Sequence, residues 1–348
     1  MTLTLDPEVA DALAPMFAAM ADATPPAVGD VQTRRTLLEG LFAHTSAAQP
    51  MPDDVTITDF STPASDGAEI LLRWYAPRGA APGPAVLYLH GGGMILGRVE
   101  LFDGPVARCA AASGVPMLSV EYRRAPEHPH PTPIEDCYAG LQWLHDHATE
   151  LGVAPDRVAV MGDSAGGGLA AGLALMARDR SGPALARQIL VMPMLDDRTT
   201  APDPEIAPFA AWSYDDNLTG WQVLLGDGAG GPTVSPYAAP ARAQDLTGLP
   251  PAYLEVGQLD IFRDEDLDYA QRLSRAGVPV EFHLHPGVPH EFDQVALPPT
   301  SPAAPPPTGS ACSPASDARQ QRPHRRPAPD RPAPARPTTA PDSPRSTR

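Results

Sequence analysis

The sequence predicts an α/β fold with a doubly wound, mostly parallel, eight-stranded sheet. Eight short runs of apolar and β-branched residues have the length of strands, at residues 55–60, 70–75, 85–89, 116–122, 158–161, 189–192, 252–256 and 280–284. Helical apolar spacing fills the stretches near residues 101–113, 134–151, 165–179 and 264–276. Strands that alternate with helices indicate βαβ units. Several central runs are apolar on both faces, which suits a sheet that is covered on both sides.

Two further segments are expected to form a helical cap. The N-terminal segment, residues 1–50, carries helical stripes on either side of Pro25 and Pro26, formed by Val9, Leu13, Met16, Phe17 and Met20 and by Leu37, Leu38, Leu41 and Phe42. An insertion at about residues 196–240 breaks the strand–helix alternation and contains Phe209, Trp212, Tyr214 and Trp221. We expect both segments to lie over the carboxyl edge of a core that spans residues 51–297.

The end of the chain differs from the rest in composition. Residues 297–348 hold 15 of the 45 prolines and show neither helical nor strand periodicity. A segment of Pro, Ala, Ser, Thr and Arg buries too little apolar surface to order itself. We therefore expect residues 298–348 to form a disordered tail.

Charge and composition exclude several classes of function. The net charge is −17, and because the tail carries eight Arg and three Asp, residues 1–296 carry −22. Such an acidic body repels nucleic acid. All 25 basic residues are Arg, so Schiff-base chemistry on a lysine and a Walker-type phosphate loop are excluded. No apolar run approaches the roughly 18 residues that a membrane span needs.

The cysteines and the N-terminus suggest a location. Three cysteines, Cys109, Cys137 and Cys312, cannot form a disulfide framework and suit a reduced compartment. Cys109 and Cys137 fall on expected helices and are interpreted as small core residues. The first residues lack the basic flank of a secretory signal. A soluble, cytoplasmic protein is the expectation.

A serine between glycines is the first sign of chemistry. Residues 162–167 read GDSAGG, directly after the apolar run at 158–161 and directly before a helical stretch. This strand–turn–helix context is that of a nucleophile elbow, in which a tight turn lifts the hydroxyl of Ser164 above the sheet. The alternative is a glycine-rich helix start with an N-cap serine.

A glycine-rich loop supplies the second sign. His90 and three glycines, residues 91–93, follow the apolar run at 85–89. Glycines leave backbone N–H groups uncovered, as an oxyanion hole requires. We predict that the N–H groups of Gly92, Gly93 and Ala165 form this hole. The alternative is a flexible loop.

The interpretation of Ser164 as the serine of a nucleophile elbow predicts the order in which its partners occur in the chain. The acid and then the histidine follow the serine along the chain. Asp260 lies in a loop after the run at 252–256, and His290 lies in a loop after the run at 280–284. Other candidates are weaker: Asp264, Asp266 and Asp268 suit the N-terminus of the next helix, and His283 and His285 belong to the last strand.

Five blocks, read in order, resemble one family. They are HGGG at 90–93, YRRAPE at 122–127, GDSAGG at 162–167, the acids around 259–265 and PGVPH at 286–290. Together they resemble the hormone-sensitive-lipase-like family of α/β-hydrolases over about residues 5–296. The resemblance implies a serine carboxylesterase with a helical cap, with Ser164, Asp260 and His290 as its triad. Glu291 departs from the family, which commonly has Gly there.

The resemblance leads to further expectations. Short- to medium-chain esters are the expected substrates, because the aromatic residues Trp212 and Trp221 leave limited room. No metal and no organic cofactor is expected: the glycines at 226, 228 and 231 lack a preceding strand, and prolines interrupt the pair His128 and His130. A small-molecule ester is the expected partner, and a homodimer is a possible assembly.

Two other hypotheses stay open. A ligand receptor on the hydrolase scaffold would be expected to lose a member of the triad, whereas this chain keeps all three candidates. A catalytically impaired family member is the other hypothesis, because the resemblance ends about seven residues after His290, where the family has a final helix. Its loss would expose apolar surface near the last strand.

Overall fold

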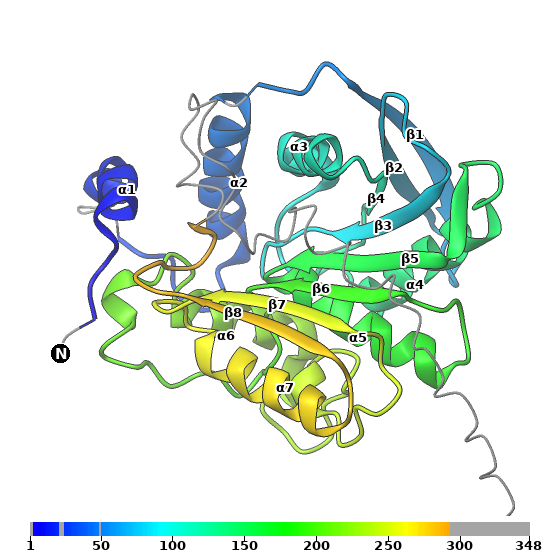
Figure 1. Cartoon of the computed structure of the whole chain (residues 1–348). Coiled ribbons are helices and arrows are strands. Elements are labelled where there is room, and N and C mark those ends of the chain that lie inside the picture. Colours follow the sequence, from blue (N-terminus) through cyan, green and yellow to red (C-terminus); the bar gives the residue numbers. More distant parts are fainter. Residues whose placement is uncertain (1–2, 21–23, 49, 293–348) are drawn as a thin grey trace, which may run out of the picture.

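The structure is a computed structural model of the 348-residue chain, and it describes residues 3–20, 24–48 and 50–292 (Figure 1). Eight strands form one sheet in the order β1-β2-β4-β3-β5-β6-β7-β8. Their bounds are β1 Val55–Pro63, β2 Glu69–Pro77, β3 Gly83–Leu89, β4 Met117–Val120, β5 Val153–Asp163, β6 Arg187–Val191, β7 Ala252–Gly257 and β8 Val280–His285. β2 pairs antiparallel with both β1 and β4, and the remaining pairs are parallel. The predicted fold class is confirmed.

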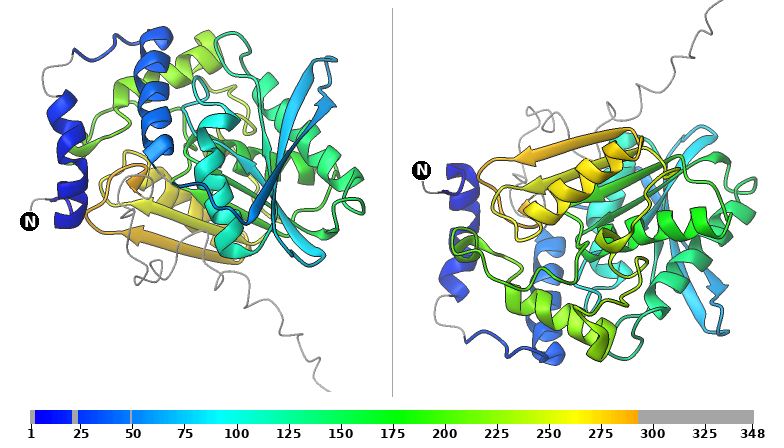
Figure 2. Two further views of the ribbon diagram at one scale, coloured as in Figure 1. Left: turned by 90° about the horizontal axis from the view of Figure 1, so that it is seen from above. Right: turned by 90° about the horizontal axis from the view of Figure 1, so that it is seen from below.

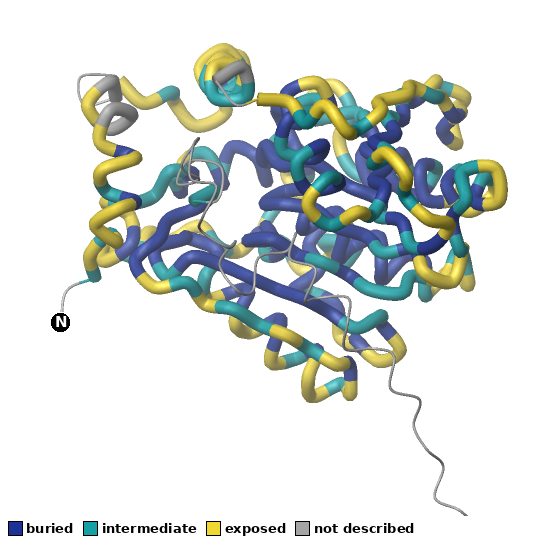
Figure 3. Tube along the Cα trace, turned by 45° about the horizontal axis from the view of Figure 1, so that its top comes forward, coloured by how far each residue is buried: buried dark blue, intermediate teal, exposed yellow. Residues whose placement is uncertain are grey.

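Helices cover both faces of this sheet. α3 (Asp103–Ser113) lies on one face, whereas α4 (Thr132–Asp146), α5 (Ala165–Asp179) and α7 (Arg263–Arg275) lie on the other (Figures 1 and 2). β4 and β7 are buried along their whole length, and β5 is mostly buried from Val158 onward, after an exposed stretch near its beginning (Figure 3). Apolar side chains fill both interfaces, and Leu87, Leu118, Val160 and Leu254 are fully buried. Burial on both faces is what the continuous apolar runs predicted.

All eight predicted strands are present, but the end of β4 and the beginning of β5 differ from the prediction. β4 stops at Val120, before the predicted end of its run, because the chain leaves the sheet there and brings Tyr122 to His90. β5 begins earlier than expected, at Val153. Strand ends depend on tertiary contacts, which apolar runs do not encode.

The N-terminal helices and the inserted helix gather at one end of the sheet. α1 (Pro7–Met20), α2 (Val31–Ala48) and α6 (Tyr214–Leu225) lie beyond the end where β7 and β8 terminate (Figure 2). Two hydrogen bonds join the beginning of α2 to α6: the Gly29 N–H donates to Thr219 Oγ1 at 3.0 Å, and Arg34 Nε donates to Asp216 Oδ1 at 2.7 Å. The two segments expected to form the cap are therefore in contact.

One expected apolar stripe needs a correction. Leu37 is 55% exposed, although the sequence predicted it on the buried face of its helix. α2 instead buries Val31 and the charged Arg34, because Arg34 has partners on several sides. In α1, Val9 and Leu13 are buried as expected, and the side chains of Met16, Phe17 and Met20 lie outside the described residues.

The cysteines differ in part from expectation. Cys137 on α4 is a free, buried thiol, as predicted. Cys109 on α3 is buried in the hydrophobic core, as predicted, but it is disulfide-bonded, which was not expected from the sequence. The expected tail at residues 298–348 lies outside the described residues. None of the helices in residues 3–20, 24–48 and 50–292 combines the length and the hydropathy of a membrane-spanning segment.

Candidate active site

Ser164 lies at a sharp turn between β5 and α5. Its φ of +53° is in the left-handed region, which is costly for a residue with a side chain. The surrounding backbone fixes this conformation: the Ser164 N–H donates to Val191 O at 2.9 Å, and its carbonyl accepts from Gly168 N at 3.0 Å. A Cβ at Gly162 would overlap the carbonyl of Gly166, so the turn needs glycine there. This is the predicted strand–turn–helix geometry.

The structure brings His290 and Asp260 to Ser164. His290 Nε2 lies 2.9 Å from Ser164 Oγ, and His290 Nδ1 lies 2.7 Å from Asp260 Oδ2. All three residues are buried. Since a carboxylate only accepts, Nδ1 carries the proton toward Asp260 and Nε2 is left to accept the Ser164 hydroxyl proton. A chain of hydrogen bonds thus connects residues that are 126 and 30 positions apart.

The electrostatic environment favours a positively charged imidazole. Burial lowers the pKa of His290, but the charge and hydrogen bond of Asp260 outweigh burial, and Glu291 and Asp163 act in the same direction. The resulting pKa of His290 is about 9. An imidazolium that forms when His290 takes the serine proton is therefore stabilised.

The glycine loop lies against the serine turn. The Gly91 N–H donates to Asp163 Oδ2 at 3.1 Å, and Tyr88 donates its hydroxyl to the other oxygen of Asp163. A Cβ at Gly166 would overlap the carbonyl of Leu89, which shows how closely the two segments approach. Gly92, Gly93 and Ala165 are the predicted oxyanion residues. Among the described residues, their backbone N–H groups have no hydrogen-bond acceptor.

His90 is held as a neutral, buried side chain at the base of this loop. Burial lowers the pKa of His90 to about 3. Tyr122 donates its hydroxyl to the His90 carbonyl at 2.7 Å, and the rings of Tyr122 and Phe102 stack on the imidazole at 4.3 and 5.2 Å.

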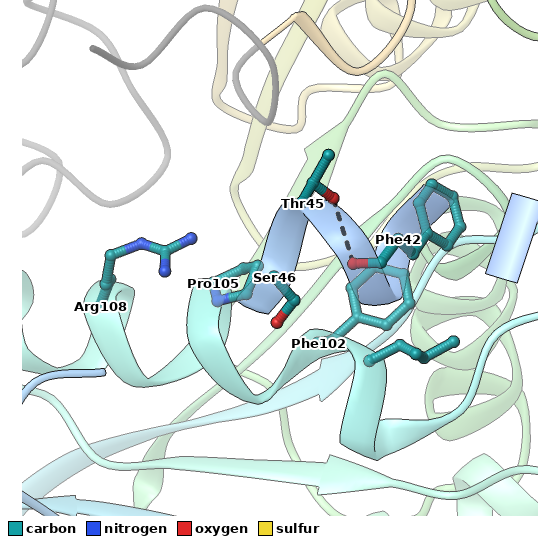
Figure 4. A pocket seen from close by; sticks show the side chains of 7 residues that line it. Phe42, Thr45, Ser46, Phe102, Pro105 and Arg108 are labelled. Carbon is teal, nitrogen blue, oxygen red and sulfur yellow. Dashed lines mark hydrogen bonds between the residues drawn. The ribbon is translucent and has the colours of Figure 1, made fainter. Parts of the chain in front are cut away.

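Phe102 also lines a small pocket between α2 and α3 (Figure 4), whose other lining residues are Phe42, Thr45, Ser46, Leu101, Pro105 and Arg108.

An aromatic residue from the insertion covers the glycine loop. The ring of Trp212 lies so close to Gly93 that a Cβ on this glycine would overlap it. Gly93 has a φ of +59°, a second reason for glycine at this position. Trp212 itself is 7% exposed. The insertion therefore reaches one of the predicted oxyanion residues directly.

The weaker candidates lie elsewhere. Asp264 is an exposed residue in the first turn of α7, and Asp266 is fully buried in the same turn. His283 and His285 belong to β8 and approach Glu281 and Glu255 instead of Ser164. In the part of the chain that the structure describes, no three His, Cys, Asp or Glu side chains gather as they would around a metal ion.

Sequence reasoning missed one residue in this region. Asp163, within the GDSAGG block, links the glycine loop to the serine turn, a role that was not predicted. Its position next to the serine was a usable signal, because a buried carboxylate needs partners and the nearest donors are backbone N–H groups of the facing loop.

Comparison with known proteins decides the family. A family model for the alpha/beta hydrolase fold matches residues 86–294. The chain belongs to the α/β-hydrolase family. Among the relatives of this α/β-hydrolase, Esterase LipI of Mycobacterium tuberculosis is 36% identical over 247 residues, which are 68% of this chain and 74% of LipI. Carboxylesterase NlhH of the same organism is 40% identical over 218 residues, 62% of this chain and 68% of NlhH.

Solved structures are similar to this α/β-hydrolase over most of its length. A bacterial heroin esterase is 42% identical with a TM-score of 0.76, covering 84% of this chain and 92% of that one. An esterase of Pyrobaculum calidifontis is 34% identical with a TM-score of 0.74 and the same coverage. The resemblance to hormone-sensitive-lipase-like esterases, predicted from five sequence blocks, is thereby confirmed.

Proposed function

We propose that this α/β-hydrolase is a serine carboxylesterase that cleaves short- to medium-chain esters through an acyl-enzyme on Ser164. The observation that carries the proposal is the pair of short contacts at His290, 2.9 Å to Ser164 Oγ and 2.7 Å to Asp260 Oδ2. The similar proteins named above are esterases, and their names agree with the predicted enzyme class, carboxylic ester hydrolase.

The first half of the reaction forms the acyl-enzyme. Ser164 Oγ attacks the ester carbonyl carbon while its proton passes to His290 Nε2. The carbonyl oxygen becomes an oxyanion, which the N–H groups of Gly92, Gly93 and Ala165 stabilise. Asp260 stabilises the imidazolium and keeps its orientation. When the tetrahedral intermediate collapses, the bond to the alkoxy oxygen breaks and His290 returns the proton to the leaving alcohol.

The second half releases the acid. Water attacks the acyl carbon and gives a proton to His290 Nε2, and the oxyanion forms again at the same N–H groups. Collapse then breaks the bond to Ser164 Oγ, which takes the proton back from His290. The acid leaves and the enzyme returns to its starting state. These reaction steps need only the residues of the chain, the ester and water.

The proposed chain-length preference depends on the cap. Trp212 lies against Gly93, so bulky substrates meet an aromatic side chain beside the proposed oxyanion hole. We assign the helical cap to residues 1–50 and to the insertion at about 196–240, over a core of residues 51–297. A series of p-nitrophenyl esters tests the preference, and turnover that keeps rising beyond an acyl chain of about ten carbons would contradict it.

Labelling with a fluorophosphonate probe tests the nucleophile. We expect the wild-type chain to become labelled at Ser164 and Ser164→Ala to stay unlabelled and to lose nearly all esterase activity. Labelling of Ser164→Ala would contradict the assignment. Binding of esters without product release would instead favour the receptor hypothesis.

A pair of variants tests the acid. Asp260→Asn is expected to lower kcat by about 10⁴-fold, because an amide stabilises the wrong tautomer of His290. Asp264→Asn is the matched control, since Asp264 lies nearby in the chain but is exposed. Equal losses in both variants would contradict the assignment of Asp260.

A further inference from the structure

We propose that Arg35 and Glu39 of α2 position the oxyanion loop, so that this cap helix controls the rate of the chemical step as well as covering the site. The inference rests on the proposed function, because it concerns the same loop. The two residues are four positions apart and therefore lie on one face of the helix. Both make hydrogen bonds to the backbone of residues 95–97, which follow the glycine loop after Met94.

Arg35 connects three parts of the chain. Its Nε donates to the Ile95 carbonyl at 2.6 Å, and its Nη2 donates to the Ala125 carbonyl at 2.9 Å. The same guanidinium binds both carboxylate oxygens of Glu127, at 2.6 and 2.7 Å. The planar fork of arginine suits such a set of acceptors, whereas the single ammonium group of lysine does not.

Glu39 acts on the next residues of the same segment. Its Oε1 accepts the Gly97 N–H at 3.2 Å, and its Oε2 accepts from Arg98 Nη1 at 3.0 Å. Arg124 donates to the Gly97 carbonyl from the other side. Both polar backbone atoms of Gly97 are thus held by charged side chains.

The held segment in turn fixes the oxyanion glycines. The N–H groups of Ile95 and Leu96 both donate to the Gly92 carbonyl at 3.0 Å. A Cβ at Gly97 would lie 2.8 Å from both the Gly91 carbonyl and His90 Nδ1, so Gly97 packs directly on the loop. A shift of residues 95–97 therefore rotates the peptide groups at Gly92 and Gly93.

Orientation of these N–H groups matters for the rate. Oxyanion donors act on a charge that develops only in the transition state, so a small misplacement lowers kcat more than substrate binding. A residue that only holds the fold together would lower stability without this selective effect. The two roles therefore give different kinetics.

The test uses Arg35→Lys and Glu39→Ala, with Glu135→Gln as the matched control. Glu135 forms a two-contact ion pair with Arg180, which follows the end of α5, and none of its side-chain hydrogen bonds or ion pairs among the described residues involves residues 90–97. For the two α2 variants we expect kcat to fall by about 10- to 100-fold, with KM changed by less than about threefold. The affinity for a trifluoromethyl ketone, whose adduct with Ser164 carries the oxyanion, should fall by the same factor as kcat/KM.

Several outcomes would overturn the proposal. An unchanged kcat in both folded variants is one, and a rise in KM alone is another. A loss of kcat without loss of trifluoromethyl ketone affinity would also contradict it. If Arg35→Lys fails to fold by circular dichroism, Glu39→Ala and Glu127→Gln supply the same comparison. Failure of the proposed function has its own signature, because the wild-type chain would then show neither fluorophosphonate labelling nor ester turnover.

Discussion

Glu291 combines two unusual features in one residue. Its φ is +54°, a conformation that favours glycine and explains why the family commonly has Gly there. Its side chain lies beside His290, and burial raises the pKa of the Glu291 carboxyl to about 7 although the charge of His290 lowers it. The negative charge of Glu291 is one of the causes of the raised pKa of His290.

Substitution of Glu291 should change the pH profile. His290 must be neutral to accept the serine proton, so kcat/KM rises as the pH rises toward the His290 pKa of about 9. Glu291→Gln and Glu291→Gly both remove a negative charge, which lowers the pKa of His290 and moves this rise to lower pH. Assays of kcat/KM from pH 5 to 10 measure the shift.

The pair of variants separates charge from backbone strain. Both variants remove the carboxylate, but only Glu291→Gly relieves the left-handed conformation, so its free energy of unfolding should exceed that of Glu291→Gln by about 1 kcal/mol. Urea unfolding of both variants provides the comparison. Identical pH profiles in the wild type and both variants would show that the carboxylate of Glu291 does not act on His290.

At this scale the sequence predicted the residues of local motifs and missed those defined by distant contacts. Ser164, Asp260 and His290 were found because each follows a strand in a known order, and the structure brings them together. Arg35 and Glu39 carry no such pattern. Their partners lie 58 to 92 residues away, and sequence spacing contains no information on those contacts.

Among the elements, α7 is anchored by a buried acid. Glu265 in its first turn accepts the N–H groups of Leu195 and Asp196 at 2.6 and 3.1 Å and the hydroxyl of Thr199. Burial raises the pKa of Glu265 to about 8, although these hydrogen bonds act in the opposite direction. The carboxyl group therefore ties the helix that follows Asp260 to the beginning of the insertion.

The raised pKa makes stability depend on pH. The folded protein holds the proton of Glu265 more tightly than the unfolded chain does. The resulting contribution of Glu265 to the free energy of unfolding is therefore fully present below about pH 4.5 and is lost as the pH rises to about 8. Glu265→Gln resembles the protonated form, so its Tm should fall less between pH 5 and pH 8. Thermal unfolding across this range tests the prediction, with Asp264→Asn as the exposed control. Parallel Tm curves for the wild type and Glu265→Gln would contradict it.

Helices and strands were predicted well in segments where a single period of hydrophobic residues dominates. Central strands such as β4 and β7 were recognised because residues buried on both faces leave a continuous apolar signature. The exposed position of Leu37 was not predicted, because the buried side of α2 is chosen by Arg34 and its partners, which lie outside the helix. The spacing of apolar residues does not identify the buried face of a helix when that face contains one partner of an ion pair.

At the scale of the whole molecule, the ion pair between Arg34 and Asp216 joins the two segments that we assign to the cap. Arg34 is 1% exposed, donates to Asp216 at 2.7 Å, and also donates to the carbonyls of Pro26, Ala27 and Asp30. Asp216 additionally caps α6 through Ser213. The N-terminal segment and the insertion are therefore stabilised together.

Removal of this carboxylate should destabilise the protein. Asp216→Ala leaves the buried charge of Arg34 uncompensated and removes a helix cap, with an expected loss of about 3–5 kcal/mol. Asp215→Ala is the control, because Asp215 is exposed in the same turn. Urea unfolding measures both. A loss below about 1 kcal/mol for Asp216→Ala would show that the cap segments do not depend on this pair.

The first turn of the chain has a practical consequence for experiments. The Asp6 N–H donates to the Gly287 carbonyl at 2.7 Å, three residues before His290, and a Cβ at Gly287 would lie 2.8 Å from the Asp6 nitrogen. A purification tag or a reporter inserted just before Asp6 would therefore lie close in sequence to a residue that contacts the loop carrying the imidazole. Kinetic comparisons are best made with protein tagged elsewhere or with the tag removed.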